Sequence, residues 1–336
     1  MKHLFLTCLA ILIISASSFT NAAEVVVYTA LDQIYSEPLL KRFEQSTGIR
    51  VLPVYDTEAN KTVGLVNRLI AEQARPRCDV FWNNEIAGTV VLKQKGILAP
   101  YASPTAEGIS STYKDPGHFW VGFAARARII IVNTDLVSSY HRPETIWDLA
   151  DQRWRGRTAI ANPLFGTTAT HAAALFAQLG SKAAKDYFLA LKENQVVVAA
   201  GNATVRDMVA RGEVAFGLTD TDDANGAIED GKPVEIVVPD QDEGGLGVLV
   251  LPNTVSLIAG APHENEGQRL IDFLLSPQTE EYLAHCRSAQ IPLRPGVRTP
   301  DKVLKISNLK VLDVPYSEIA SAFPESRKFI HEEFLP

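Results

Sequence analysis

The 336-residue chain is 46% hydrophobic, 21% charged and 8% aromatic, a composition that supports one large domain or two ordinary ones. It excludes an intrinsically disordered chain and a disulfide-dense miniprotein. Lys and Arg total 32 against 39 Asp and Glu, and the net charge of -7 argues against nucleic acid or an anionic membrane as the main partner. A small ligand is the better expectation.

The start of the chain has the pattern of a secretory signal. Lys2 and His3 precede an apolar run at residues 4–14, and a small polar segment leads to Ala22 and Ala23. This pattern predicts a signal peptide, residues 1–23, cleaved near Ala22 or Ala23, and hence a periplasmic protein. The alternative, an N-terminal membrane anchor, is disfavoured because the run is shorter than the roughly 20 residues of a spanning helix.

Two cysteines remain after the predicted cleavage. Export permits a disulfide between Cys78 and Cys286. Cys78 opens an apolar strand-like run and Cys286 lies on a helix-like segment, so two buried free thiols are the first expectation and a disulfide is the alternative.

Strand-like and helix-like segments then alternate. Apolar or β-branched runs predict strands at residues 24–29, 50–55 and 79–82, and helical spacing predicts helices at 37–47, 60–73 and 86–95. This βαβαβα order predicts a parallel sheet with crossover helices.

The pattern changes after a polar stretch at residues 103–118. A long central strand is predicted at 127–132. The later elements are strands at 158–161, 196–199, 214–218, 234–238, 247–251 and 255–258, and helices at 168–179, 183–193, 204–211, 223–230, 266–274 and 277–286. We expect an α/β protein of two lobes, each with a mixed, mostly parallel sheet flanked by helices. Lobe 1 comprises 24–125 plus about 247–300, and lobe 2 comprises 126–246 plus about 301–336.

Ligands of open α/β sheets bind past the carboxyl ends of the strands, so the loops there are the candidate site. The candidate ligand-binding residues in these loops are Thr29, Asp32, Gln33, Asp56, Asn84, Glu85, Gly166, Thr167, Thr168, Asn202, Asp220, Thr221, Asp222 and Asp223. Arg126 and Arg128 alternate at the start of the central strand and therefore share a face, where they suit either an anion or salt bridges between the lobes. Asp56, Asn84 and Asp220 are equally suited to helix capping.

Residues 165–171 are the more specific signal. Gly166 is followed by two hydroxyl residues, Thr167 and Thr168, at the start of a predicted helix whose free N–H groups and dipole favour an anion. A plain helix cap is the alternative. His171 lies one turn further, where we expect a packed or hydrogen-bonded histidine.

Asp220, Asp222 and Asp223 form an acidic cluster after a predicted strand. An EF-hand is excluded by the spacing, because with Gly226 at the turn position the first ligand is Thr221 and the closing acid is Lys232. The cluster suits a hard cation or an organic ammonium group, and a solvated helix start is the alternative.

Catalytic signatures are absent from the sequence. There is no nucleophile elbow, no phosphate loop and no zinc-protease motif, since His331-Glu332-Glu333 lacks the second histidine. An enzyme is therefore the weaker class. The enzyme that stays as an alternative is a secreted metal-dependent phosphatase or lyase that uses the acidic cluster.

Several segments in this order carry a family resemblance. They are VVYT at 26–29, FEQSTGI at 43–49, DVFW at 79–82, RAR at 126–128, and GEVA with GL at 212–218. Over about residues 24–297 the chain resembles the ferric-iron-binding branch of the periplasmic solute-binding proteins of ABC transporters.

The resemblance implies a two-lobed periplasmic-binding-protein fold that closes on a ligand in the cleft between its lobes. It also implies a monomer that delivers its ligand to an inner-membrane ABC permease, with no nucleic acid as partner and no catalytic cofactor. The bound ligand is expected to be Fe(III), or another hard cation, with a synergistic anion on Gly166, Thr167 and Thr168. The implied metal ligands are Asp32, Glu85, Asp222 and Asp223, with Asn84 as the alternative to Glu85.

The sequence departs from that branch where many iron binders carry two tyrosines. Asp222 and Asp223 stand there, and carboxylates accept many hard cations as well as ammonium groups. Related branches take sugar phosphates or aminoalkylphosphonates. Such a zwitterion would place its anionic end at Thr167 and Thr168, beside Arg126 or Arg128, and its amine at Asp32, Asp222 or Asp223. Tyr35 is the one phenol that falls in a predicted strand-end loop.

Overall fold

The computed structural model describes residues 23–56 and 63–335. The predicted signal peptide lies outside these residues except for Ala23. Within the two ranges, no helix is both long and apolar enough to cross a membrane.

The first half of the chain has the predicted βαβαβα order. Its elements are β1 (Glu24–Thr29), α1 (Gln33–Thr47), β2 (Arg50–Tyr55), α2 (Val63–Ala71), β3 (Val80–Asn83) and α3 (Ile86–Gln94). β1 pairs in parallel with β2 on one side and with β3 on the other. α1 ends at Gly48, whose φ of 72° is the left-handed conformation that glycine adopts without strain. Helix α1 begins four residues earlier than predicted, so Gln33 and Tyr35 lie in its first turn and not in a loop.

Two long strands run between the halves of the molecule. β5 (Val121–Asn133) is buried along its whole length and extends well beyond the predicted 127–132. β10 (Val250–Ile258) is a single strand, so the prediction of two strands at 247–251 and 255–258 is wrong. A register shift between Pro252 and Asn253, where β10 pairs antiparallel with β5, accommodates the residues that interrupt the apolar pattern.

The second half repeats the α/β alternation. Its elements are β6 (Thr158–Ala161), α4 (Gly166–Leu179), α5 (Ser181–Glu193), β7 (Val197–Ala199), α6 (Asn202–Ala210), β8 (Phe216–Asp220), α7 (Thr221–Glu229) and β9 (Val234–Val237). β6 pairs in parallel with β7 and β8, whereas β5 pairs antiparallel with β8 and β9. The strand order is β2-β1-β3-β10-β5-β8-β6-β7, and the short β4 (Leu98–Ala99) pairs with β10.

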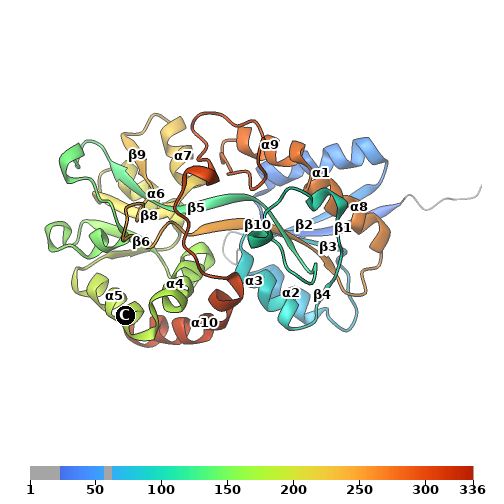
Figure 1. The fold of residues 1–336 in the computed structure, drawn as a ribbon, viewed down its shortest axis with the longest axis horizontal. Helices are drawn as coiled ribbons and strands as arrows, with labels where there is room; N and C mark the ends of the chain where they lie inside the picture. The colour runs from blue at the N-terminus through green and yellow to red at the C-terminus, as the bar shows by residue number, and fades with distance from the viewer. Residues whose placement is uncertain (1–22, 57–62, 336) are drawn as a thin grey trace, which may run out of the picture.

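The last helices of the chain pack on elements of both halves of the molecule. α8 (Glu264–Leu274) packs on β1 and β3, and α9 (Pro277–His285) contacts β5. α10 (Tyr316–Phe329), which the sequence pattern did not predict, packs against both α3 and α4 (Figure 1). Short helical turns complete the fold at Pro104–Ala106, Ser111–Tyr113, Ser139–His141, Ile146–Ala150, Gln152–Trp154, Ile306–Asn308 and Ile330–Phe334.

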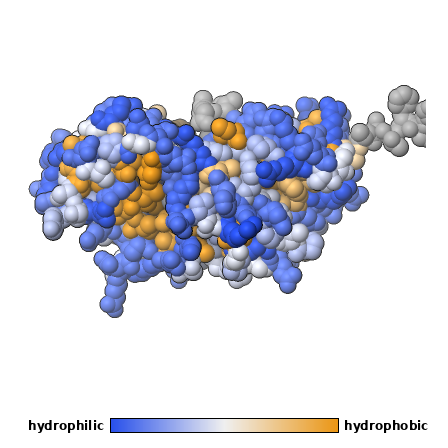
Figure 2. Space-filling model, turned by 90° about the horizontal axis from the view of Figure 1, so that it is seen from above, coloured by the Kyte–Doolittle hydropathy of each residue, from blue (hydrophilic) through white to orange (hydrophobic). Residues whose placement is uncertain are grey.

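The elements gather at two ends of an elongated molecule. β1 to β4 lie at one end with α1 to α3, α8 and α9, while β6 to β9 lie at the other with α4 to α7, and β5 and β10 connect them (Figure 1). The sequence-based lobe boundaries stay a prediction. Figure 2 shows a mostly hydrophilic surface with a hydrophobic patch over the end that holds β9 and α7.

Candidate functional site

A buried ion pair lies where β5 and β8 run side by side. Arg128 Nη1 donates to Asp220 Oδ1 at 2.7 Å, and both side chains are shielded almost completely from solvent. Burial alone raises the pKa of the Asp220 carboxyl, but Arg128 and Arg126 outweigh it, so the net pKa is lowered. The prediction that Arg126 and Arg128 share a face of the strand is confirmed, because both guanidinium groups reach Asp220.

The hydroxyls at the start of α4 join this pair. Thr167 Oγ1 donates to Asp220 Oδ2 at 2.7 Å, and Arg128 donates to Thr167 and Thr168 at 3.2 Å each. Asn202, at the start of α6, donates to Thr167 Oγ1 at 2.8 Å and to Asp220 Oδ2 at 3.0 Å. These contacts bring together four residues that the sequence placed in three separate loops: Thr167, Thr168, Asn202 and Asp220.

The first turn of α4 begins without a side-chain cap. Its N-cap, Phe165, has no side-chain oxygen to accept from the first amides of the helix. The positive end of the helix dipole therefore favours an external acceptor. Inside the helix His171 is buried, and burial, with Arg128 nearby, lowers its pKa to about 3. His171 is thus a neutral packed side chain at pH 7, as expected from the sequence.

Arg126 connects the acidic cluster to the loop after β3. Its Nη1 lies 3.4 Å from Asp222 Oδ2 and 3.6 Å from Asp220 Oδ2, and its Nη2 donates to the Asn84 carbonyl at 2.5 Å. Burial lowers the pKa of the guanidinium, but Asp222 and Asp220 raise it by more, so Arg126 stays charged.

The three carboxylates of the acidic cluster lie close together but have different neighbours. Asp220, Asp222 and Asp223 each offer an oxygen within 4.8 Å of the others. Asp222 faces Arg126, whereas Asp223 accepts from Thr219 Oγ1 at 3.3 Å and lies 3.6 Å from Arg206 Nη1. Burial, followed by repulsion from Asp222 and Asp220, raises the pKa of Asp223 well above its ordinary value. Thr221 also has a structural partner, since its hydroxyl accepts from the amide of Ala127.

Glu85 is the N-cap of α3. Its carboxylate accepts from the amides of Ala87 and Gly88 at 2.7 and 3.0 Å, and from Thr170 Oγ1 of α4 at 2.6 Å. Burial raises its pKa, although these hydrogen bonds act in the opposite direction. Glu85 therefore connects α3 to α4, a role for which the sequence offered only the residue type.

The candidates in the first two loops make hydrogen bonds within their own end of the molecule. Thr29 Oγ1 accepts from the amide of Leu31 at 3.2 Å, and Gln33 donates to Glu37 on the outside of α1. The Asp56 amide donates to the Thr29 carbonyl, and Asp32 is the N-cap residue of α1.

Tyr35 joins α1 to the candidate site. Burial, then repulsion from Asp222 and Asp32, raises its pKa to about 12. Asp32 belongs to the end of the molecule that holds α1, and Asp222 to the end that holds α7 (Figure 1). The sequence indicated this phenol only by its nearness to the end of β1. Thr170 and Arg206, which anchor Glu85 and Asp223, were missed because they lie inside helices.

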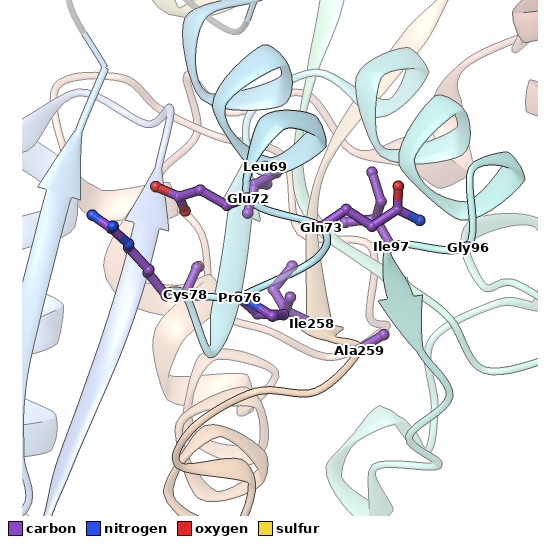
Figure 3. A pocket seen from close by; sticks show the side chains of 10 residues that line it. Leu69, Glu72, Gln73, Pro76, Cys78, Gly96, Ile97, Ile258 and Ala259 are labelled. Carbon is purple, nitrogen blue, oxygen red and sulfur yellow. The ribbon is translucent and has the colours of Figure 1, made fainter.

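Cys78 and two cavities lie away from Asp220 and its partners. One cavity, of about 40 Å³ and with room for little more than water, is lined in part by Cys78, just before the amino end of β3 (Figure 3). Asn84 follows the other end of that strand. A larger hollow of about 450 Å³ lies beneath residues 102–121. Cys78 and Cys286 are both free, so the disulfide alternative is wrong. Cys78 is buried as expected, whereas Cys286 is only half-buried.

The fold is that of a two-lobed α/β protein in which loops from several strand ends meet at one site. Comparison with known families gives its membership: the chain belongs to the family of bacterial extracellular solute-binding proteins, whose model matches residues 39–310. It is a solute-binding protein, from a family defined by binding and not by catalysis.

The names of the relatives give different ligands. The chain is 24% identical over 300 residues to the Fe(3+)-binding periplasmic protein of Serratia marcescens, covering 88% of this chain and 86% of the relative. It is 25% identical over 300 residues to a putative 2-aminoethylphosphonate-binding periplasmic protein of Salmonella typhimurium, covering 86% and 85%.

Solved structures confirm the periplasmic-binding-protein fold. Iron-bound HitA from Pseudomonas aeruginosa superposes with a TM-score of 0.82 at 21% identity, covering 92% of this chain and 99% of HitA. AfuA from Actinobacillus pleuropneumoniae, with fructose-6-phosphate bound, gives a TM-score of 0.80 at 24% identity, covering 94% and 99%.

Proposed function

We propose that the protein is a periplasmic receptor that binds ferric ion together with a small anion between its two lobes and delivers them to an inner-membrane ABC permease. The observation that carries this proposal is the adjacency of two opposite kinds of site. Thr167, in the first turn of α4, is hydrogen-bonded at 2.7 Å to Asp220, a member of the acidic cluster. An anion at α4 and a cation at the cluster would therefore be neighbours.

The proposed metal ligands follow from the neighbours of each carboxylate. Asp222 lies 3.4 Å from Arg126, and both Asp222 and Asp32, the N-cap of α1, raise the pKa of Tyr35 by repulsion. Carboxylate and phenolate oxygens are hard donors that suit a trivalent ion. Glu85 and Asp223 have structural partners of their own, so we propose that they support the site and do not ligate the metal.

The second candidate ligand is an aminoalkylphosphonate. It is favoured by residues 219–223, which carry carboxylates and no phenol pair, so an ammonium group fits them as well as a metal does. Its phosphonate would occupy the first turn of α4, in the place of the synergistic anion. The named relatives include proteins of both kinds.

Equilibrium dialysis against ferric nitrilotriacetate, with and without inorganic phosphate, tests the leading proposal. We expect one ferric ion per chain, bound more tightly with phosphate present. Asp222→Asn removes a proposed ligand and should lower the affinity at least about tenfold. Asp186→Asn, the same change at an exposed pair on α5, is the matched control and should leave the affinity unchanged.

Two results would overturn the proposal. If calorimetry detects 2-aminoethylphosphonate but dialysis detects no ferric ion, the second candidate replaces the first. If the protein turns over a phosphorylated substrate and Asp222→Ala abolishes that turnover, the protein is an enzyme.

A further inference from the structure

The guanidinium of Arg126 is held differently from that of Arg128. Arg128 Nη1 lies 2.7 Å from Asp220 Oδ1, the usual distance of a charge-assisted hydrogen bond. Arg126 Nη1 lies farther from its two carboxylates, 3.6 Å from Asp220 Oδ2 and 3.4 Å from Asp222 Oδ2. Its shortest hydrogen bond runs to the carbonyl of Asn84. Arg126 therefore neutralises the acidic cluster without being locked to it.

The other two carboxylates of the cluster have cations of their own. Asp220 pairs with Arg128, and Asp223 lies 3.6 Å from Arg206 of α6. Asp222 is the carboxylate that faces Arg126. A metal ion on Asp222 would lie within a few ångströms of the Arg126 charge, and like charges at that separation repel each other strongly in a buried site.

An anion in the same space meets the opposite condition. Arg126 and Arg128 share a face of β5, and Arg128 already donates to Thr167 and Thr168 in the first turn of α4. A negative group at that turn would therefore be attracted by both guanidinium groups.

We infer that Arg126 is a tethered cation that determines which ligands the site accepts: it opposes a bare metal ion at Asp222 and attracts the anionic group of the ligand. The inference rests on the proposed function, since it assigns a specificity role within that site. A metal ion binds tightly only together with an anion that attracts the guanidinium of Arg126 toward α4. An organic zwitterion satisfies the same requirement in one molecule.

Arg126→Gln tests this role with two probes. Terbium(III) luminescence measures the affinity for a hard trivalent metal ion, and calorimetry with inorganic phosphate measures the affinity for an anion. We expect Arg126→Gln to bind terbium at least about tenfold more tightly than the unaltered protein, and phosphate at least about tenfold more weakly.

Arg206→Gln is the matched control. It removes the same charge at 3.6 Å from another carboxylate of the cluster, but from α6. We expect less than about a threefold change with either probe, because Arg206 lies behind Asp223 and not beside Asp222. Equal shifts in the two variants would overturn the inference, since they would show that only net charge matters. Unchanged terbium affinity in Arg126→Gln would overturn it as well.

A third variant keeps the test decisive if circular dichroism shows that Arg126→Gln is unfolded. Arg126→Lys retains the charge and should bind terbium within about threefold of the unaltered protein, so a tenfold gain would contradict the inference. The proposed function fails separately, if the unaltered protein binds neither ferric ion nor 2-aminoethylphosphonate, whereas the ratios between variants still decide the role of Arg126.

Discussion

Replacing Asp220 by alanine should destabilise the protein strongly. Asp220 accepts hydrogen bonds from Arg128 and Thr167 at 2.7 Å each and from Asn202 at 3.0 Å, and its side chain is 1% exposed. Alanine leaves the buried Arg128 charge without its counter-ion, and breaking a buried pair in this way costs about 3–5 kcal/mol. At about 2 °C per kcal/mol for a chain of this size, the midpoint of thermal unfolding should fall by about 6–10 °C.

Urea unfolding at pH 7, followed by circular dichroism, measures this loss. Asp222→Asn is the control, because its side chain is 19% exposed and Arg126 keeps Asp220 as a second counter-ion at 3.6 Å, so we expect a change within about 1 kcal/mol. The lowered pKa of Asp220 also determines how its contribution to stability depends on pH. The stabilisation is complete above the unfolded-state pKa of about 3.9 and is lost as the pH falls through the lower folded-state pKa. If Asp220→Ala costs no more than Asp222→Asn, the buried ion pair does not organise the site.

Three further predictions concern the protein outside that ion pair. Burial raises the folded-state pKa of Glu85 above its unfolded-state value of about 4.3. The free energy of unfolding should therefore fall as the pH rises from the unfolded-state pKa through the folded-state pKa. Glu85→Gln should remove that decline, and urea midpoints between pH 4 and pH 8 that fall as steeply as before would contradict it. Gly247→Ala combines a φ of 84° with a Cβ position 2.7 Å from the backbone of Val311, and should cost at least about 3 kcal/mol in urea unfolding. Gly231→Ala, at a φ of 67° with nothing within 4 Å, should cost only about 1–2 kcal/mol, and equal losses would show that the close approach does not matter. Cys78 is fully buried with a raised pKa, so a thiol reagent should modify it only on unfolding, and rapid reaction in the native protein would refute this.

The order of the elements was predictable because each has a strong local pattern. Leu39, Leu40 and Phe43 fix the register of α1, but its start was predicted too late because Ile34, in its first turn, is 72% exposed and lies off the apolar face. α10 was not predicted, since its buried positions are few and include only Ile319, Ala320, Ser326 and Phe329.

The candidate site was partly predictable for a similar reason. Alternation along a strand placed Arg126 and Arg128 on one face, and the carboxyl ends of β6 and β8 brought Thr167 near Asp220. The differences between Asp222 and Asp223, and the capping role of Glu85, were not predictable. They depend on Arg206 of α6 and Thr170 of α4, which meet these carboxylates only through tertiary packing.

Native mass spectrometry of the protein purified from periplasm, compared with its denatured mass and combined with elemental analysis, addresses the ligand directly. For the unaltered protein we predict an excess equal to one iron atom plus one small anion, and for Asp222→Asn we predict no excess. An iron-free excess would identify an organic ligand instead. A native mass equal to the denatured mass, after growth with ample iron and phosphonate, would contradict the view that these converging loops hold a paired cation and anion.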